Sequence, residues 1–347
     1  MKKREGFISI ISLIVMSVLY IMVLYLGYTA KLEYLILSST VNKTQSYYQS
    51  EGKIYMSVYD DKYYINQLYP NLLDEFRRDG PRIRENNVII DSDDLEPEDN
   101  IEKIEVSFID EDNRFKLKLS SESNFNNTKT KLISTGTMVN EIFEIQESVL
   151  ALDLIDDKYK EDFEELFKRI CKDISINNCN RPESVFGIES TNYSRIILDK
   201  KNTKNYEISA SRETMINPYI ERFNKDKVFI VARSFDENPV NLFIGSPEEG
   251  DRSKGKINLS GIIFVEGNLI ISEDLDFKGI IIVKDGKIIV DPMKKSKIQG
   301  LIITENLNDV DHFIEQTGII RSRDTIYKYG TYIPGFLDVK IDLIKGS

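Results

Sequence analysis

Two cysteines and one histidine are the residues of this sequence whose side chains most readily bind metals or form covalent bonds. Cys171 and Cys179 stand eight positions apart, and His312 is distant from both. A tetrahedral zinc site needs four ligands, so these three residues do not predict a metal site. Outside the cytoplasm, the two cysteines can close a small disulfide loop. The alternative is two ordinary thiols, one of them buried on the preceding helix.

Carboxylates in the last third of the chain are the other candidates for chemistry. Enzymes that cleave polysaccharides hold two carboxylates at a fixed separation. The acids here lie in or near turns, and their spacing places no matched pair on one strand face: Glu266, Asp274, Asp276, Asp285 and Asp291. The sequence also lacks a phosphate-binding loop ending in Lys-Ser/Thr and a Gly-x-Ser-x-Gly motif. We interpret these acids as solvated turn residues and expect a protein that is not an enzyme and needs no cofactor.

The charge balance argues against nucleic acid as a partner. The 347-residue chain has a net charge of -11, and no run of Lys and Arg forms the basic patch that nucleic acids require. The acidic stretch 91–99 lacks the glycine and glutamate spacing of a calcium-binding loop, and we interpret it as solvated. Beyond an apolar N-terminal segment about 310 residues remain, which is enough for roughly two domains.

The apolar segment predicts a membrane helix. Phe7 to Ala30 carries no charged side chain, and a helix of that length spans about 36 Å, enough to cross a bilayer. The basic residues before it favour a cytoplasmic N-terminus, with the rest of the chain outside the cell membrane. The apolar run is longer than that of a secretory signal peptide, and Ala30 alone is a poor cleavage signal. We therefore expect the helix to be retained.

The junction Lys-Lys-Arg-Glu-Gly6-Phe7 resembles the leader of type IV prepilins and pseudopilins. The resemblance implies that prepilin peptidase cuts between Gly6 and Phe7 and leaves the membrane helix in place. One position departs from the pattern, because Ile11 stands where most pilins carry Glu at the fifth mature residue. This departure is known from some minor subunits and is at odds with the packing of a major pilin. The alternative is a signal anchor that happens to contain a glycine.

The helix is expected to continue over residues 31–61, which contain no proline. Tyr48, Tyr55, Val58 and Tyr59 form an apolar stripe at helical spacing, with which we expect this half to lie on a globular domain. The stretch 46–60 is similar to a segment of PilX-like minor pilins, in which a small-Glu-small triplet follows two aromatic residues. The resemblance makes Glu51 and Gly52 candidates for subunit packing, together with Ile11. Without such a role, Glu51 is a solvated residue and Gly52 costs roughly 1 kcal/mol relative to Ala.

Residues 62–150 predict a pilin-like head of helix and hairpins. A second short helix is expected over 63–84, and alternating apolar residues predict a hairpin over 101–121. A further hairpin is expected over 130–149, with its turn at 136–140. Its Ser-Thr-Gly-Thr sequence at 134–137 resembles a strand of the PilX-like family. An amphipathic helix is expected over 156–173.

Glycines punctuate the last third of the chain at regular spacing. Gly261, Gly279 and Gly300 each precede a run of apolar residues, at intervals of 18 and 21 positions. Short strands repeated at this period are typical of a β-solenoid, in which stacked rungs bury each other's apolar faces. Residues 228–232 and 240–244 are candidates for a degenerate first rung. A plain antiparallel meander is the competing interpretation.

The predicted fold is α+β, with a long N-terminal transmembrane and amphipathic helix, a pilin-like α/β head and a C-terminal short β-solenoid-like domain. The expected segments are a leader (1–6), a transmembrane helix (7–30), its extracytoplasmic continuation (31–61), a pilin-like part (62–150), a helical and mixed connector (151–225) and the β-solenoid-like domain (226–347). The predicted function is that of a non-catalytic PilX-type minor pilin of a type IV pilus or related filament system. Its partners would be other pilin-like subunits, the assembly machinery and prepilin peptidase in the bacterial cell membrane. The alternative is a signal-anchored surface protein whose C-terminal β domain binds carbohydrate or protein.

Overall fold

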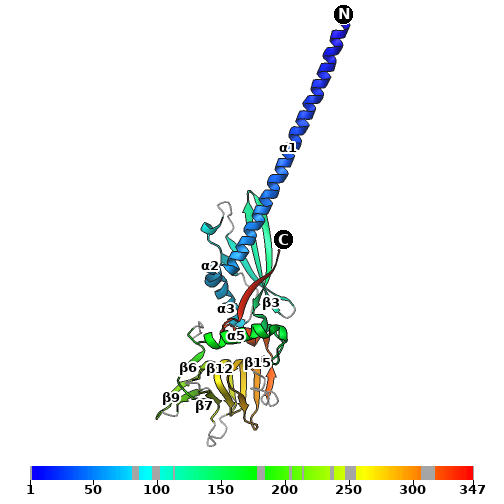
Figure 1. Ribbon diagram of the computed structural model, residues 1–347. Helices are drawn as coiled ribbons and strands as arrows, with labels where there is room; N and C mark the ends of the chain where they lie inside the picture. The colour runs from blue at the N-terminus through cyan, green and yellow to red at the C-terminus, as the bar shows by residue number, and fades with distance from the viewer. Residues whose placement is uncertain are drawn as a thin grey trace.

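The computed structural model describes residues 2–79, 86–95, 102–111, 114–177, 184–202, 205–212, 215–234, 238–246, 255–305 and 317–346. Cys179, His312 and residues 96–99 of the acidic stretch lie outside these ranges. Figure 1 shows a long helix that projects from a smaller head, with a larger β unit at the opposite end of the head.

One uninterrupted helix forms the N-terminal part of the molecule, as expected. Helix α1 (Lys2–Tyr59) is 58 residues long, which corresponds to roughly 87 Å. Its first half stands free of the rest of the described chain, and its second half packs on strands of the head (Figure 1). Neither Gly27 nor Gly52 interrupts it, because a single glycine weakens a helix without breaking it.

Short helical segments follow α1 and fold back against the head, in the region where a second helix was expected. They are α2 (Asp61–Tyr63), the π-helical turn η1 (Tyr64–Leu68) and α3 (Tyr69–Asp79). Leu68, Leu72 and Phe76 are fully buried and fix this segment against the core.

An antiparallel sheet forms the head, in the strand order β1-β2-β3-β4-β17. Its strands are β1 (Asn86–Ile89), β2 (Lys103–Glu111), β3 (Arg114–Phe125), β4 (Thr128–Val139) and β17 (Leu337–Gly346). A short 3-10 turn, η2 (Ser92–Asp94), follows β1. The hairpin expected over 101–121 is confirmed by β2 and β3. The C-terminal strand β17 pairs with β4, so the end of the chain returns to the head.

The turn expected at 136–140 is wrong. Gly136 lies in the middle of β4, paired with Leu117 on one side and Ile341 on the other. A Cβ atom at this position would lie 2.2 Å from the carbonyl oxygen of Lys340. The glycine therefore permits the close approach of β17, a strand 200 positions away that local pattern does not reveal.

The second half of the chain forms a larger β unit, which we call the parallel stack. Its strands are β5 (Val149–Leu150), β6 (Phe186–Ser190), β7 (Arg195–Lys200), β8 (Tyr206–Ser211), β9 (Tyr219–Phe223), β10 (Lys227–Ala232), β11 (Val240–Ile244), β12 (Ile257–Ile271), β13 (Leu275–Lys284), β14 (Ile288–Val290), β15 (Ser296–Thr304) and β16 (Thr317–Ile320). Strands β10, β12, β13, β15 and β16 pair in parallel, whereas β7, β8 and β9 are joined by antiparallel pairing. The pairing includes β6–β9, so it crosses the boundary expected near residue 225. The competing interpretation, an antiparallel meander, is wrong for the glycine repeats.

The glycine repeat sets the register of the stack. Gly261 is paired with Gly279, and Gly279 with Gly300, as the 18- and 21-residue intervals predict. A Cβ atom at Gly279 would lie 1.8 Å from the carbonyl oxygen of Gly261. Gly261 and Gly300 also adopt φ values of +132° and +149°, which residues with a side chain rarely adopt. Strand β12 pairs with β10 through its first part and with β11 through its last.

Alternate residues of the central strands face two different cores. Ile263, Ile281 and Ile302 lie inside the stack. Their neighbours Ile262, Ile280 and Leu301 lie on the outer face and join the core of the head. A strand buried on both faces reads as a continuous apolar run, which explains the repeated Ile-Ile and Leu-Ile sequences after each glycine.

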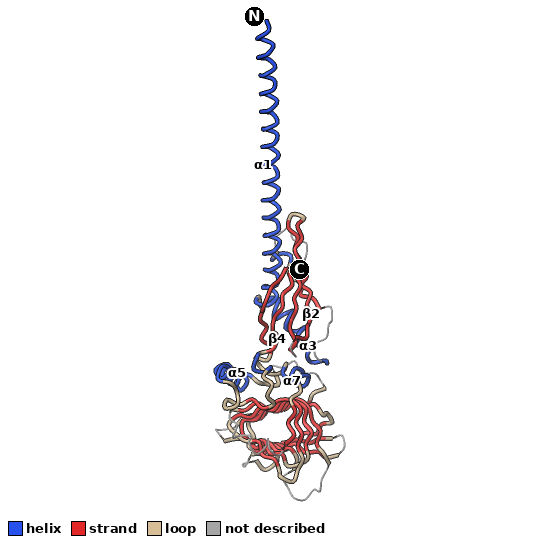
Figure 2. The backbone as a smooth tube through the Cα atoms, turned by 90° about the vertical axis from the view of Figure 1, so that its right-hand side faces the viewer, coloured by secondary structure: helices blue, strands red, loops and turns tan. Residues whose placement is uncertain are grey.

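Helices cover that outer face and join the stack to the head. They are α4 (Glu141–Glu144), α5 (Lys160–Asp173), preceded by the 3-10 turn η3 (Asp157–Tyr159), and α7 (Arg323–Gly330). In Figure 2 the strands of the stack ring an elongated section, and α5 and α7 lie between it and the head sheet. Helix α5 confirms the amphipathic helix expected over 156–173, and Phe163, Leu166 and Ile170 form its buried face.

Candidate functional site: the free helix and its attachment to the head

The first half of α1 presents apolar side chains that no other part of the described chain covers. Phe7 is 65% exposed and Met16 75% exposed, and the most apolar window of the helix is 0% buried. Among the described residues, α1 is the one helix long and apolar enough to cross a membrane. Burying apolar surface is favourable by roughly 25 cal/mol per Å². Covering this half of α1 with apolar surroundings is therefore favourable, and its length and composition are compatible with a membrane span.

The second half of α1 meets the head through polar side chains. Ser46 donates a hydrogen bond to the carbonyl oxygen of Ser123 at 2.9 Å. Ser50 donates to the carbonyl oxygen of Thr130 at 3.1 Å. Positions 46, 50, 53 and 57 share one face of a helix because they are spaced by three or four residues. This face is buried in the head, and it is largely hydroxylic.

A buried lysine completes this face. Lys53 is 1% exposed, and its Nζ donates a hydrogen bond to the carbonyl oxygen of Glu122 at 3.1 Å. Ammonium groups are rarely buried without partners, because desolvation of the charge is costly. Lys53 therefore holds α1 in one register against β3.

Several buried polar atoms in the same interface have no hydrogen-bond partner among the described residues. They are both amide atoms of Gln49, the hydroxyl groups of Ser121 and Ser123, and the side-chain oxygen of Asn124. Each unsatisfied group reduces stability by roughly 1–3 kcal/mol. The contact of α1 with the head thus combines these polar groups with the buried apolar side chains of Ile54 and Val58.

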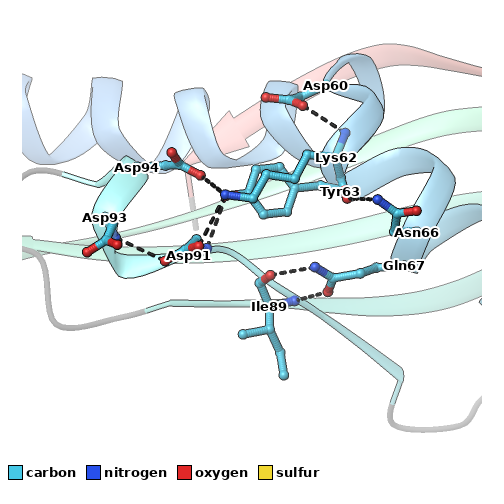
Figure 3. Close-up of polar contacts among 9 residues, drawn as sticks. All are labelled: Asp60, Lys62, Tyr63, Asn66, Gln67, Ile89, Asp91, Asp93 and Asp94. Carbon is cyan, nitrogen blue, oxygen red and sulfur yellow. Dashed lines mark hydrogen bonds and ion pairs between the residues drawn. The ribbon is translucent and has the colours of Figure 1, made fainter.

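Figure 3 shows a polar cluster where the chain turns back after α1. Asp60 caps α2 by accepting a hydrogen bond from the backbone amide of Lys62. The Lys62 ammonium contacts Asp94 at 2.6 Å and Asp91 at 3.1 Å. Tyr63 donates a hydrogen bond to Asp94 and accepts one from the backbone amide of Asp91 at 3.1 Å. This cluster ties η2 to the start of the turn.

These contacts shift the pKa values of Lys62, Asp91 and Asp94. The hydrogen bond to Lys62 lowers the pKa of Asp94, and the hydrogen bond from Tyr63 lowers it further. For Asp91, the backbone hydrogen bond from Asp93 is the largest cause of its lowered pKa, followed by Lys62. The pKa of Lys62 is raised by the same two carboxylates. The carboxylates and the ammonium group are ionised at neutral pH and partly exposed, so the cluster forms a local tether at the surface.

Gln67 provides a second tether beside this cluster. Its amide donates to the carbonyl oxygen of Ile89 at 2.8 Å and accepts from the amide of Ile89 at 2.7 Å. The side chain thus pairs with the edge of β1 as a neighbouring strand would, and it satisfies backbone groups that an edge strand leaves open.

The residues that the sequence singled out for processing and packing do not meet at one site. Gly6, Phe7 and Ile11 lie near the start of α1, and Ile11 is 44% exposed. Glu51 and Gly52 lie about 60 Å further along the same helix. Glu51 is half-buried, and a Cβ atom added at Gly52 would have no neighbour within 4 Å. Packing within the described chain therefore does not explain the glycine.

The apolar stripe expected to face the head is wrong in part. Val58 is buried, but Tyr48, Tyr55 and Tyr59 are 61%, 43% and 60% exposed. The head instead receives the serines, Lys53 and Ile54. Sequence reasoning missed this face because hydroxyl groups and a lysine resemble a solvated surface; their spacing at 46, 50, 53 and 57 is the signal that was available.

Cys171 is buried on α5, and burial raises the pKa of its thiol to about 12. Cys179 lies outside the described residues, so the disulfide stays a prediction.

The carboxylates of the glycine repeats have structural partners. Glu266 bonds Arg233 and Lys284, and Asp276 pairs with Lys256 at 2.9 Å. Asp274 and Asp291 accept hydrogen bonds from backbone amides. Asp285 lies 3.6 Å from Lys284.

Comparison with known proteins finds no similar family, protein or structure. No protein-family model matches this chain, and neither a curated protein nor a solved structure matches it. Functional inference therefore depends on the geometry of α1 and the head.

Proposed function

We propose that this chain is a non-catalytic subunit of a type IV pilus or a related filament system, of the minor pilin kind. Prepilin peptidase would cleave between Gly6 and Phe7, and the helix would remain in the bacterial cell membrane until assembly. One observation carries the proposal: α1 joins an unpartnered apolar half to a half that packs on an antiparallel sheet. An assembly of such helices would cover the apolar half in the filament.

The proposed orientation in the membrane follows from the basic residues that precede the apolar run. The N-terminus would be cytoplasmic, and the head and the parallel stack would lie outside the membrane. The stack lies at the end of the head opposite the N-terminus of α1 (Figure 1). The protein would therefore present the stack outward, with other pilin-like subunits as its partners along α1.

We also propose that the parallel stack is a short β-solenoid. The paired glycines and the alternation of Ile-rich residues between two cores support this classification. Repeats of this kind form rigid units because each rung buries the apolar face of its neighbour. Such a unit suits display at the surface of a filament.

The test is the N-terminus of the protein made in the presence of prepilin peptidase. Mass spectrometry of the full chain should find a product that begins at Phe7. Gly6→Val should abolish this product. The matched control is Gly27→Val in the same helix, where an added Cβ atom meets no described atom within 4 Å; it should be processed normally. A chain that keeps residues 1–6 with active peptidase would refute the proposal.

A further inference from the structure

A cavity of about 310 Å³ opens where the head meets the parallel stack. It is lined by Glu144, Gln146, Arg321 and Arg323. Glu144 ends α4, and the two arginines flank the start of α7. The proposed role in a filament does not involve this cavity.

Arg321 is the distinctive group of the cavity. Its guanidinium donates to the carbonyl oxygens of Phe143 at 2.7 Å and Glu147 at 3.1 Å. Burial lowers its pKa, and it forms no ion pair with any carboxylate in the described ranges. A guanidinium has five N–H donors, and within the described part of the chain these two bonds leave some of them open. A partly desolvated cation of this kind favours an anionic partner.

Arg323 is held beside it. Both of its terminal nitrogens contact the Asp110 carboxylate, at 3.2 and 3.0 Å. Its guanidinium also lies 4.3 Å from the centre of the Phe115 ring. These contacts fix the side chain before any ligand arrives, which lowers the entropic cost of binding.

Glu144 is the acidic group of the cavity and is 6% exposed. Tyr327 of α7 donates a hydrogen bond to its Oε1. Burial raises its pKa, although Tyr327 and the guanidinium groups of Arg114, Arg321 and Arg323 act in the opposite direction. When ionised, this carboxylate competes with any other anion for the arginines. When protonated, it no longer offsets the positive charge of Arg321, whereas Arg323 stays paired with Asp110.

We propose that this cavity binds a small ligand through an oxyanion group, a carboxylate, sulfate or phosphate. The lining provides guanidinium and amide donors against one carboxyl group, so a ligand rich in acceptor oxygens fits it best. The volume admits a group of about monosaccharide size. The protein as a whole carries a net charge of -11, so attraction comes from the cavity and not from the general field.

Isothermal titration calorimetry on the full chain in detergent micelles tests this inference. The probes are sodium sulfate, inorganic phosphate and glucuronate. Saturable heat from at least one is expected, and the preferred probe separates a phosphate ester from an acidic sugar as the source. Arg321→Gln should abolish binding, whereas Arg195→Gln, on β7 of the stack, should leave it unchanged. Saturable heat from none of the probes overturns the inference.

Two further measurements guard against a variant that fails to fold. Glu144→Gln keeps the shape of the side chain and removes its charge, so binding should tighten on the order of tenfold. Sulfate keeps its charge across the working pH range, and its binding should strengthen as the pH falls toward the raised pKa of Glu144. A Glu144→Gln protein that retains the thermal unfolding profile but binds no more tightly contradicts the inference, as does pH-independent sulfate binding.

Discussion

The attachment of α1 to the head and the interior of the parallel stack are held together by different chemistry. Serine hydroxyl groups and Lys53 join α1 to carbonyl oxygens of β3 and β4. Fully buried isoleucines, such as Ile263, Ile281 and Ile302, fill the stack. Apolar burial provides most of the net stability of a fold, whereas a neutral hydrogen bond adds only about 1 kcal/mol. The interior of the stack is thus held by apolar packing, whereas the helix interface combines polar contacts with the buried side chains of Ile54 and Val58.

This difference agrees with the proposed role of the two parts. A helix that moves from a membrane into an assembly needs a defined register against its head, but it does not need to be clamped there. A unit presented outward benefits from rigid, repeated packing.

The largest expected effect is at the paired glycines of the stack. Gly279→Ala places a Cβ atom within 1.8 Å of the carbonyl oxygen of Gly261, a backbone atom that cannot move alone. We expect a loss of roughly 4 kcal/mol or more in the free energy of unfolding, or failure to fold. Urea unfolding of the full chain in micelles, followed by circular dichroism, measures this.

The control for that variant is Gly318→Ala on β16. An added Cβ atom there meets no described atom within 4 Å, and the change should stay within about 0.5 kcal/mol. Equal losses in both variants would mean that close packing of the paired glycines does not hold the stack together.

A smaller effect of opposite sign is expected in the helix interface. Gln49→Leu removes two buried amide atoms that have no partner among the described residues. The variant should be as stable as the parent chain or more stable by about 1 kcal/mol, because an unsatisfied polar group is costly.

Ser50→Ala, which removes the hydrogen bond to Thr130, should lose about 0.5 kcal/mol, since the helix propensity of Ala offsets part of the cost. Denaturant titration measures the free energy of unfolding of both variants. A marked destabilisation by Gln49→Leu would show that the Gln49 amide forms hydrogen bonds that contribute to stability.

The smallest effect concerns the solvated tether at Lys62. Lys62→Met should lower Tm by about 1–2 °C at neutral pH, because exposed ion pairs contribute little. The lowered carboxyl pKa values of Asp91 and Asp94 mean that the tether is complete above their ordinary value of 3.8 and is lost as the pH falls through the lowered values. The raised pKa of Lys62 means that it is lost again only in strong alkali.

Thermal unfolding across pH checks this sign. The Tm difference between the parent chain and Lys62→Met should be constant from about pH 5 to 9 and should shrink as the pH falls below 3.8 through the lowered pKa values of Asp91 and Asp94. A difference that grows as the pH falls would rule out the ion pairs as its origin.

Local sequence pattern predicted the elements whose residues interact at a fixed, short spacing along the chain. The apolar run and absence of proline predicted a continuous helix up to residue 61, and α1 ends at Tyr59. The spacing of Gly261, Gly279 and Gly300 predicted the register of three strands. Periodicity of this kind is sufficient because the partners of each residue lie a fixed number of positions away.

Long-range pairing decided the rest. Gly136 lies in a strand and not in a turn, because β17 returns from the end of the chain to pair with β4. The cavity beside Arg321 likewise combines side chains about 180 positions apart, and no local signal points to it.

By itself, the amino-acid sequence determined the long apolar helix in the N-terminal part and the glycine-aligned repeats over residues 257–304. Only the tertiary structure decided which face of α1 is buried. Tyrosine and serine both tolerate a helix, and the choice between them was made by the carbonyl groups of β3 and β4, which offer hydrogen-bond acceptors to Ser46, Ser50 and Lys53. The periodicity of a helix can be found in its own residues, but the surface on which it packs is formed by residues distant in the sequence.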